Sequence, residues 1–344
     1  MSHQLYDIKI LHPKDSLEEW DRFVDSSAQG SIYSKSFWLK AISAVTGGSF
    51  EILAAYKGGN LFGGIGLHIR KSFLGNVVNC PILTPYNSIL LKKQDTRYPG
   101  KAESENLEIT EAIIQSLDDS SKYSVVEIKN SPHLTDVRPF SWKGWGRNIL
   151  YTYEIALHDF NRQAELISHS VNKQIRKCRE SGVHISAHDD PEKFYRLFSM
   201  PFVRQQISLP ITWEKFRELM DQLKQHECYR MYFAELENGE AVSARIALFS
   251  DNEIAHDWVA GADPQYFQTG ATVFLLWKVI EDLAEKGYKF LDLNGANIGH
   301  IAKFKSEFGG RLAPYYEVTK YNSPLLKLAL MARRKIMAKA AKIV

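Results

Sequence analysis

Hydrophobic and polar positions alternate with two different periods along the first half of the chain. Leu5–Leu11 has the two-residue period of a half-buried strand, whereas Ser16–Asp25 and Ser34–Val45 have the 3.6-residue period of helices. Ser16, with Glu19 three residues later, is the expected cap of the first of these helices. The pattern then predicts a helix at 107–117 and strands at 50–56, 61–70, 73–78 and 124–128.

The second half repeats this mixture of elements after a strand at 151–157. The patterns predict helices at 169–180, 192–205, 213–225, 270–285 and 300–308. They predict strands at 183–187, 229–236, 241–250, 253–260, 290–293 and 312–320.

The two halves also resemble each other in sequence. Residues 54–67 and 233–248 both have a strand ending near alanine, a turn with glycine, and a second strand with small residues. Any β-hairpin shares some of these features, but the order of elements around both segments matches as well. We therefore expect an α/β fold of two related domains, 1–148 and 149–320, with a helix at 321–344 that packs back on the first.

Composition narrows the class of protein. At 344 residues, with 44% hydrophobic and 12% aromatic residues, the chain suits two globular domains. It has no apolar run long enough to span a membrane, and Met1–Asp7 has no signal-peptide pattern. Three dispersed cysteines argue against disulfides and cysteine-rich metal sites, so a cytoplasmic protein is expected. The net charge of +3 excludes a protein that coats nucleic acid through its overall charge.

Several segments resemble a known family. Asn172–Val183, Leu291–Gly295, Ile301–Gly310 and Pro314–Tyr316 are similar to the C-terminal half of the FemAB-like branch of the GNAT acyltransferase superfamily. Ser34–Lys40 and Cys80–Tyr86 are similar to segments of that family's first half. The resemblance extends from about Ser31 to Tyr316.

The resemblance implies tandem GNAT-like domains that transfer an acyl or aminoacyl group onto an amine of a cell-envelope or surface-polysaccharide precursor. The donor would be acyl-CoA or aminoacyl-tRNA, and no tightly bound cofactor or metal is expected. Typical acetyl-CoA enzymes cradle the pyrophosphate on a glycine-rich loop before a helix. Here Phe267–Thr272 keeps one glycine of that pattern, so Gln268, Thr269 and Gly270 are the candidate donor-binding residues.

Lys305 and Asp292 are the candidate catalytic residues. Lys305 lies between Phe304 and a Phe-Gly-Gly turn, where its ammonium could stabilise a phosphate or an oxyanion; the alternative is a solvated lysine. Asp292 and Asn294 share one side of a predicted strand, where the aspartate could accept a proton from the acceptor amine or cap the following loop.

Basic residues are the main candidates for substrate binding. Lys173, Arg176 and Lys177 share one helix face, opposite a buried stripe, and would grip phosphate or simply face solvent. Arg245 lies in an apolar strand and therefore needs a partner or a ligand. Lys40 is expected to help to bind a charged acceptor.

Two further substrate-binding candidates are His256 and Tyr86. His256-Asp257-Trp258 could line a sugar-binding cleft, although a hydrogen-bonded histidine of the core is the alternative. Tyr86 is suggested by the family resemblance alone. His184 and His188 lie roughly 13 Å apart on an extended strand, too far for one metal ion.

The C-terminal segment reads as a basic amphipathic helix that starts at Ser323-Pro324. It would dock on the first domain; the alternatives are that it lies on anionic lipid at the inner face of a membrane, or that it binds RNA. The predicted activity is an acyl or aminoacyl transfer by direct attack, in a monomer or weak dimer. Two alternatives are a non-catalytic module that binds a nucleotide-sugar or lipid-linked glycan, and a tRNA-binding protein.

Overall fold

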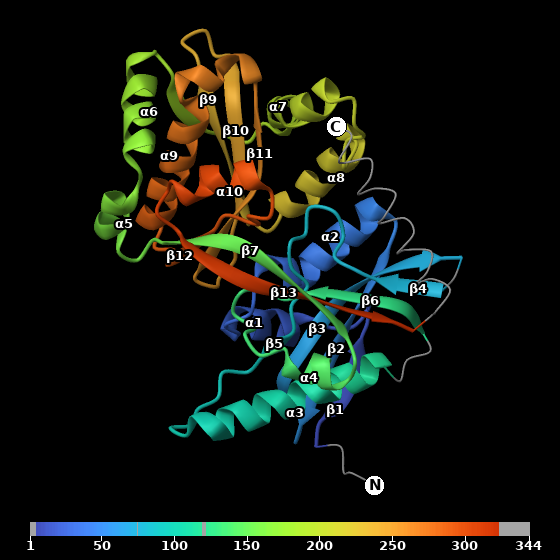
Figure 1. Ribbon diagram of the computed structural model, residues 1–344. Helices are drawn as coiled ribbons and strands as arrows, with labels where there is room; N and C mark the ends of the chain where they lie inside the picture. The colour runs from blue at the N-terminus through green and yellow to red at the C-terminus, as the bar shows by residue number, and fades with distance from the viewer. Residues whose placement is uncertain (1–4, 74, 119–121, 323–344) are drawn as a thin grey trace. The chain divides into compact units, whose positions relative to one another are not determined.

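The computed structural model describes residues 5–73, 75–118 and 122–322 (Figure 1). Their contacts divide the chain into two compact units. Of the described residues, unit 1 contains those up to Gly30, those within Thr46–Ile149 and those from Tyr316 onward. Unit 2 contains Ser31–Val45 and Leu150–Tyr315. The helix predicted after Ser323 lies outside the described residues.

The strands of unit 1 pair in the order β1, β2, β3, β4, β6 and β13. Neighbours are antiparallel except for β4 and β6, which are parallel. The short strand β5 (Leu90–Leu91) pairs with β3. The ordered strands are β1 (Asp7–Leu11), β2 (Ser49–Lys57), β3 (Asn60–Ser72), β4 (Gly75–Val78), β6 (Tyr123–Lys129) and β13 (Arg311–Tyr321).

Unit 2 has the same arrangement of strands. The order β8, β9, β10, β11, β12 and β7 is antiparallel except for the parallel pair β11 and β12. These strands are β8 (His184–Ala187), β9 (Tyr229–Glu235), β10 (Ala241–Leu248), β11 (Ile254–Ala262), β12 (Phe290–Asp292) and β7 (Gly146–Ala156). The hairpins β2–β3 and β9–β10 are the two segments whose sequences resemble each other.

The two units differ in where the last strand comes from. In unit 1 the final strand, β13, is contributed by the C-terminal part of the chain. In unit 2 the final strand, β7, precedes all the other strands of that unit. Unit 1 is thus completed by a strand that lies far along the chain from its other strands, whereas β7 directly precedes the rest of unit 2 in the chain.

Helices cover both faces of the unit 2 strands (Figure 1). The helices α6 (His169–Glu180) and α9 (Ala271–Glu285) pack against each other, and α9 also packs on β9 and β10. The helix α7 (Pro191–Arg204) packs on β10 and β11 and contacts α8 (Trp213–Lys224). The remaining elements of this unit are η1 (Ile32–Ser34), α2 (Ser36–Thr46), α5 (Phe160–Leu166), η2 (Pro264–Thr269) and α10 (Gly299–Ser306).

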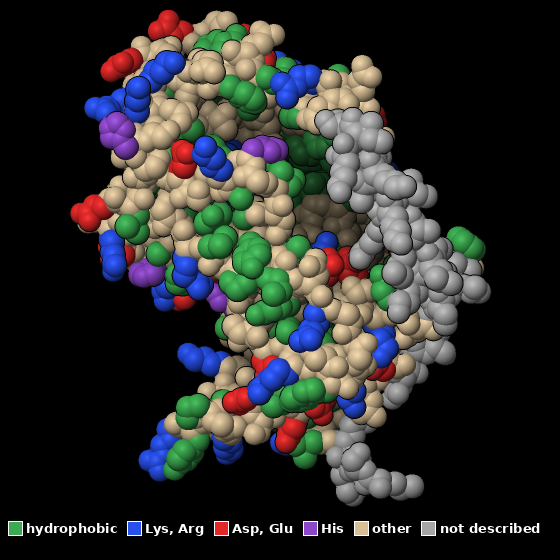
Figure 2. Space-filling view, viewed as in Figure 1, with side chains coloured by type: hydrophobic (Ala, Val, Ile, Leu, Met, Phe, Trp, Pro, Cys, Tyr) green, Lys and Arg blue, Asp and Glu red, His purple; other side chains and the backbone are tan. Residues whose placement is uncertain are grey.

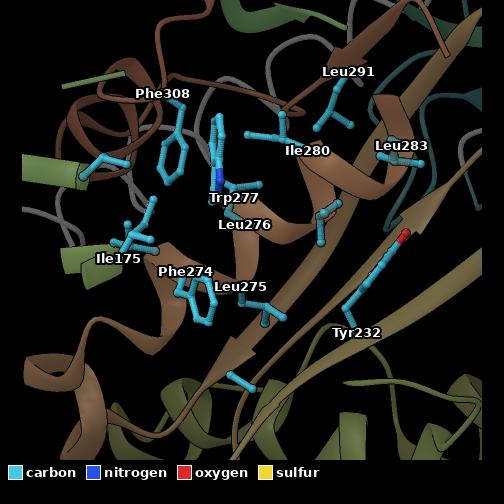
Figure 3. Packing of buried hydrophobic residues seen from close by; sticks show 14 of the residues in the cluster. Ile175, Tyr232, Phe274, Leu275, Leu276, Trp277, Ile280, Leu283, Leu291 and Phe308 are labelled. Carbon is cyan, nitrogen blue, oxygen red and sulfur yellow. The ribbon is translucent and has the colours of Figure 1, made fainter. Parts of the chain in front are cut away.

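On one face of the unit 2 strands, α9 lies at the centre of the hydrophobic core. Phe274 and Trp277 project from this helix into a cluster with Ile175 of α6 and with Phe308 (Figure 3). From β9, Tyr232 joins the same cluster, whereas the next residue, Phe233, has the ammonium of Lys193 in α7 5.6 Å from its ring centre. The alternation of β9 therefore serves two helical layers.

Unit 1 carries α1 (Glu18–Ser26), α3 (Pro99–Asp118) and α4 (Arg138–Trp142). The turn predicted between its first two long strands is confirmed: Lys57 pairs with Asn60, and Gly58 and Gly59 both have positive φ. The predicted cap at Ser16 is wrong. α1 begins at Glu18, and its cap, Leu17, makes no side-chain capping bond. The helix α3 begins eight residues before the predicted start at 107. The prediction missed its first turns because they are polar and lack an apolar stripe.

Candidate active site

The site begins where two parallel strands of unit 2 separate. β11 and β12 pair only over Ile254–His256 and Phe290–Asp292. Beyond Asp292 the chain leaves the strand direction, because Asn294 and Gly295 both have positive φ. β11 continues to Ala262, paired with β10 on its other side. No strand among the described residues pairs with the opened edge of β11.

A β-bulge lies at the start of this opened edge. The register between β10 and β11 shifts after the pair Ile246 and Val259, so that Ala247 pairs with Asp257. Trp258 is the extra residue, and its ring packs edge-on against Trp38 of α2, with ring centres 5.6 Å apart. Bulges re-aim the neighbouring side chains and are common beside functional sites.

A cavity of about 550 Å³ lies against this edge, which is a common size for a small-molecule site. Figure 2 shows the surface hollowed between α10 and α7, with hydrophobic side chains in the wall. Most of the lining is apolar and comes from α7, β11, α9 and α10, with a few polar groups among it. The lining residues include Pro201, Trp258, Phe267, Val273, Ile301 and Phe304, and the polar Gln174, Arg245, Asp257, Asn294, His300 and Lys305.

The charged pair of the cavity is Arg245 and Asp257. Their side chains meet at 2.6 Å between Nη1 and Oδ2. Both residues are buried, with 4% and 6% of their surface exposed. The guanidinium lies 5.8 Å from the ring centre of Phe304. The partner that Arg245 was predicted to need is therefore the aspartate of the neighbouring strand.

This pair leaves two polar atoms unused. Arg245 Nε and Asp257 Oδ1 are buried and have no hydrogen-bond partner among the described residues. An unmade hydrogen bond at such an atom costs about 1–3 kcal/mol. Both residues that carry this cost line the cavity.

Lys305 lies in the cavity wall, but its ammonium is fully engaged by backbone. It donates to the carbonyl oxygens of Leu293, of Asn294 at 3.0 Å and of Gly295 at 2.7 Å. An ammonium has three donors, so these bonds use all of them. Burial lowers the pKa of Lys305, and Arg245 lowers it further, while the carboxylates of Asp257 and Asp292 act in the opposite sense. The lysine fixes the loop after β12.

Asp292 and His256 lie behind the wall in one hydrogen-bond network. Asp292 accepts from Thr152 Oγ1 at 2.6 Å and from the backbone N–H of Asn294 at 2.8 Å. Nδ1 of His256 lies 3.2 Å from Oδ1 of Asn294, whose amide nitrogen donates to Tyr33 at 2.9 Å. Neither Asp292 nor His256 is among the residues that line the cavity.

The predicted alternation of Asp292 and Asn294 along one strand is wrong. β12 ends at Asp292, and Asn294 has a φ of +52°. The short hydrogen bond from the Asn294 backbone to Asp292 turns the chain back instead. This turn brings the side chain of Asn294 into the cavity wall and its carbonyl to Lys305.

The candidate donor segment forms the start of α9. Gly270 has a φ of +81°, and a Cβ there would lie 2.7 Å from the carbonyl oxygen of Gln174, so only glycine fits. Lys177 Nζ donates to the carbonyl oxygen of Gln268 at 2.6 Å, and Thr269 Oγ1 donates to Tyr266. These bonds hold the segment in place and leave Thr272 and Val273 in the cavity wall.

The other candidates lie away from the cavity lining. Lys173 and Arg176 are exposed on α6, opposite the buried Val171 and Ile175, so the predicted faces of this helix are confirmed. Lys40 is exposed on α2. Tyr86 is buried in unit 1.

The histidines excluded as metal ligands meet at one carboxylate. Nε2 of His184 lies 3.6 Å, and Nε2 of His188 4.0 Å, from oxygens of Glu235, which also accepts from Lys193 and Ser186. The strand ends at Ala187, so the extended spacing that separates the two rings does not reach His188. Among the described residues, no group of three or more His, Cys, Asp or Glu side chains is placed to hold a metal ion.

Comparison with known proteins identifies the class of domain and of fold. Residues 168–306 match the model of the acetyltransferase (GNAT) domain family. The solved structure of FemX covers 93% of this chain and 99% of its own, with a TM-score of 0.71 at 13% identity. A tandem GNAT protein from the clavulanic acid biosynthesis pathway covers 92% of this chain and 99% of its own, with a TM-score of 0.52 at 10% identity.

A third similar structure is the C-terminal domain of a putative lysylphosphatidylglycerol synthetase from Agrobacterium fabrum. It covers 91% of this chain and 95% of its own, with a TM-score of 0.57 at 11% identity. No curated protein matches the chain in sequence. Residues 168–306 are thus a GNAT domain, and the chain has the tandem GNAT fold expected from its resemblance to the FemAB-like branch.

No described helix combines the length and apolar character that crossing a bilayer requires.

Proposed function

We propose that the chain is an N-acyltransferase whose active site is the cavity of unit 2, and that its donor is an acyl thioester such as acyl-CoA. The observation that carries this proposal is the opened edge of β11 beside an apolar cavity. A strand edge with which no other strand pairs can bind an extended, amide-containing chain as an added strand would be bound. The pantetheine arm of acyl-CoA is such a chain, whereas the ribose ester of aminoacyl-tRNA offers no peptide-like groups to pair.

The start of α9 supports the same donor. A helix N-terminus carries partial positive charge and free N–H groups, which favour phosphate oxygens. α9 is 15 residues long, and its residues Thr272 and Val273 line the cavity. The exposed cations Lys173 and Arg176 on α6, the helix that packs on α9, would add favourable charge for the phosphates.

The chemistry in this proposal is direct attack of an amine on the thioester carbonyl. The cavity contributes by holding the two reactants together and by excluding water with its apolar wall. Its acceptor would be an amine on a cell-envelope or surface-polysaccharide precursor, for which the support is the family resemblance.

Titration calorimetry with CoA, acetyl-CoA and aminoacyl-tRNA, together with thiol release from acetyl-CoA, tests the proposal. We expect CoA binding that weakens at least tenfold in Thr272→Glu, because the new carboxylate opposes phosphate at the start of α9. Asn238→Glu, which adds the same charge to the exposed β9–β10 turn, should bind as the wild type does. Binding of aminoacyl-tRNA but not of CoA would overturn the choice of donor, and binding of neither would overturn the transferase proposal.

A further inference from the structure

Arg245 and Asp257, which line the cavity, each have one unused polar atom, and the two atoms differ in chemical type. Asp257 Oδ1 can only accept hydrogen bonds while it is ionised, and Arg245 Nε can only donate. Their other ends hold each other at 2.6 Å, so each side chain is fixed in place. Asp257 Oδ1 therefore lacks a donor, and Arg245 Nε lacks an acceptor.

An acyl transfer supplies these two missing partners. The attacking amine has N–H groups to donate, and the thioester carbonyl has an oxygen that accepts and becomes negative in the transition state. We propose, on the basis of the proposed function, that Asp257 Oδ1 binds the acceptor amine and that Arg245 Nε binds the carbonyl oxygen of the donor. Arg245 and Asp257 are then catalytic residues.

The charges around the pair indicate which form of the amine is bound. Arg245 and Lys305 are cations, Asp257 and the nearby Asp292 are anions, and the four charges sum to zero. A cationic ammonium would add an unbalanced charge to an apolar cavity, whereas a neutral amine would not. The acceptor is therefore bound as a neutral primary amine, and the neutral amine is also the nucleophile.

The step balances without a further reactant. The amine lone pair attacks the carbonyl carbon, a C–N bond forms, and the π pair moves to the oxygen beside Arg245 Nε. The oxyanion then restores the C=O bond, the C–S bond breaks, and the thiolate leaves with its electron pair. One proton passes from the nitrogen to Asp257, which afterwards releases it to the thiolate or to water.

The test uses binding of small neutral probes, which does not depend on finding the natural acceptor. Aniline and toluene have the same ring, but only aniline has N–H donors. We expect the full chain to bind aniline about tenfold more tightly than toluene at pH 8, as one hydrogen bond to a carboxylate would give. In Asp257→Asn the amide oxygen stays on Arg245 and its NH₂ faces the probe, so the preference should disappear.

A second variant guards against misfolding. Asp257→Asn leaves Arg245 without a counter-charge, which can unfold a buried site. The double variant R245M/D257L removes both charges and keeps the volume, and it should also bind both probes equally. Lys303→Gln, at an exposed position of α10, is the matched control and should keep the preference.

Transfer kinetics test the role of Arg245. Arg245→Lys keeps the charge but removes the second fixed donor, so kcat for acetyl transfer to aniline should fall about 100-fold, with CoA affinity unchanged. Equal wild-type affinity for aniline and toluene, or a preference that survives in Asp257→Asn, overturns the inference. If CoA still binds in those cases, the proposed function stands without this inference. Failure of the wild type to bind CoA would count against the proposed function itself.

Discussion

The side chain of Lys305 lies in the cavity wall, and its ammonium is bound by backbone. From the sequence, a lysine before a glycine turn is a candidate catalytic cation, and Lys305 does line the cavity. Its three N–H donors are nevertheless bound to three consecutive carbonyls, Leu293 to Gly295. The lysine therefore holds the loop that follows β12. By holding this loop, which contributes Asn294 to the cavity wall, it acts as a positioning residue.

Replacing Lys305 distinguishes this role from a catalytic one. Lys305→Met should lower the free energy of unfolding by about 2–3 kcal/mol, because three carbonyls lose a charged donor. Lys303→Met, on the exposed side of the same helix, should change it by less than about 0.5 kcal/mol. Urea unfolding measures both. A Lys305→Met protein of wild-type stability that has lost transfer activity would contradict the positioning role.

A buried histidine in unit 1 gives a prediction about pH. Burial, helped by Arg70, lowers the pKa of His68 from 6.5 to about 4. Between these values the unfolded chain binds a proton that the folded chain does not, so stability falls as pH drops from about 6.5 to about 4. The full loss is roughly 3 kcal/mol at 1.36 kcal/mol per pKa unit.

Chemical unfolding at several pH values checks this. His68→Gln should flatten the dependence between pH 6.5 and 4, whereas His12→Gln, at an exposed position, should leave it as in the wild type. The same slope in His68→Gln and the wild type would show that another group causes the loss.

At the scale of elements, the site depends on how closely α7 approaches β11. Gly261 of β11 lies directly under this helix: a Cβ there would be 2.3 Å from the backbone nitrogen of Phe198. A rigid backbone cannot give way as a flexible side chain can, so the absence of a side chain at this position sets the spacing of the two elements. Gly261 and Pro201 of α7 both belong to the cavity lining.

Gly261→Ala should therefore destabilise unit 2 and change the cavity. We expect a loss of about 1–3 kcal/mol, the usual cost of overpacking, with weaker binding of CoA. Gly299→Ala in α10 is the control, since a Cβ there meets nothing within 4 Å. Unfolding curves for the two variants and CoA titrations of the folded proteins measure this. Equal stability of Gly261→Ala and the wild type would mean that α7 is free to shift.

At the scale of the whole molecule, the described residues contain two copies of one strand pattern, and the site described above belongs to the copy in unit 2. Both units have four antiparallel strands, a parallel fifth and an antiparallel sixth. The charged pair of Arg245 and Asp257 belongs to unit 2. In the aligned strand of unit 1, the segment Phe62–Leu67 carries no charged residue.

Hydrogen exchange can test this division. Saturating CoA should slow amide exchange in β11, in the first turn of α9 and in α10, because ligand binding suppresses local opening. Peptides from β2 and β3 of unit 1 should exchange at unchanged rates. Mass spectrometry of digested protein resolves these segments, and protection confined to β2 and β3 would move the donor site to unit 1.

Much of this architecture could be predicted from local sequence. The periods of two and 3.6 residues identify most of the long strands and helices, because one face of each is buried. The Lys57–Asn60 turn and the special position of Gly270 follow from the conformational freedom of glycine. The repeat was visible because the hairpins β2–β3 and β9–β10 must bury the same kinds of faces. An arginine in an apolar strand also signalled that Arg245 needs a partner.

The identity of that partner and the assembly of the site were decided by tertiary structure. Asp257 meets Arg245 through the register of β10 and β11, which a single bulge at Trp258 shifts. Lys305 meets the 293–295 carbonyls because the chain turns at Asn294 and α10 folds back over it. The sequence by itself indicated most of the long elements, together with Arg245 and Lys305, which both line the cavity. Only the fold determined which of them meet, because the period of hydrophobic positions does not fix the register of strands, the turn at Asn294 or the separation of β11 from β12.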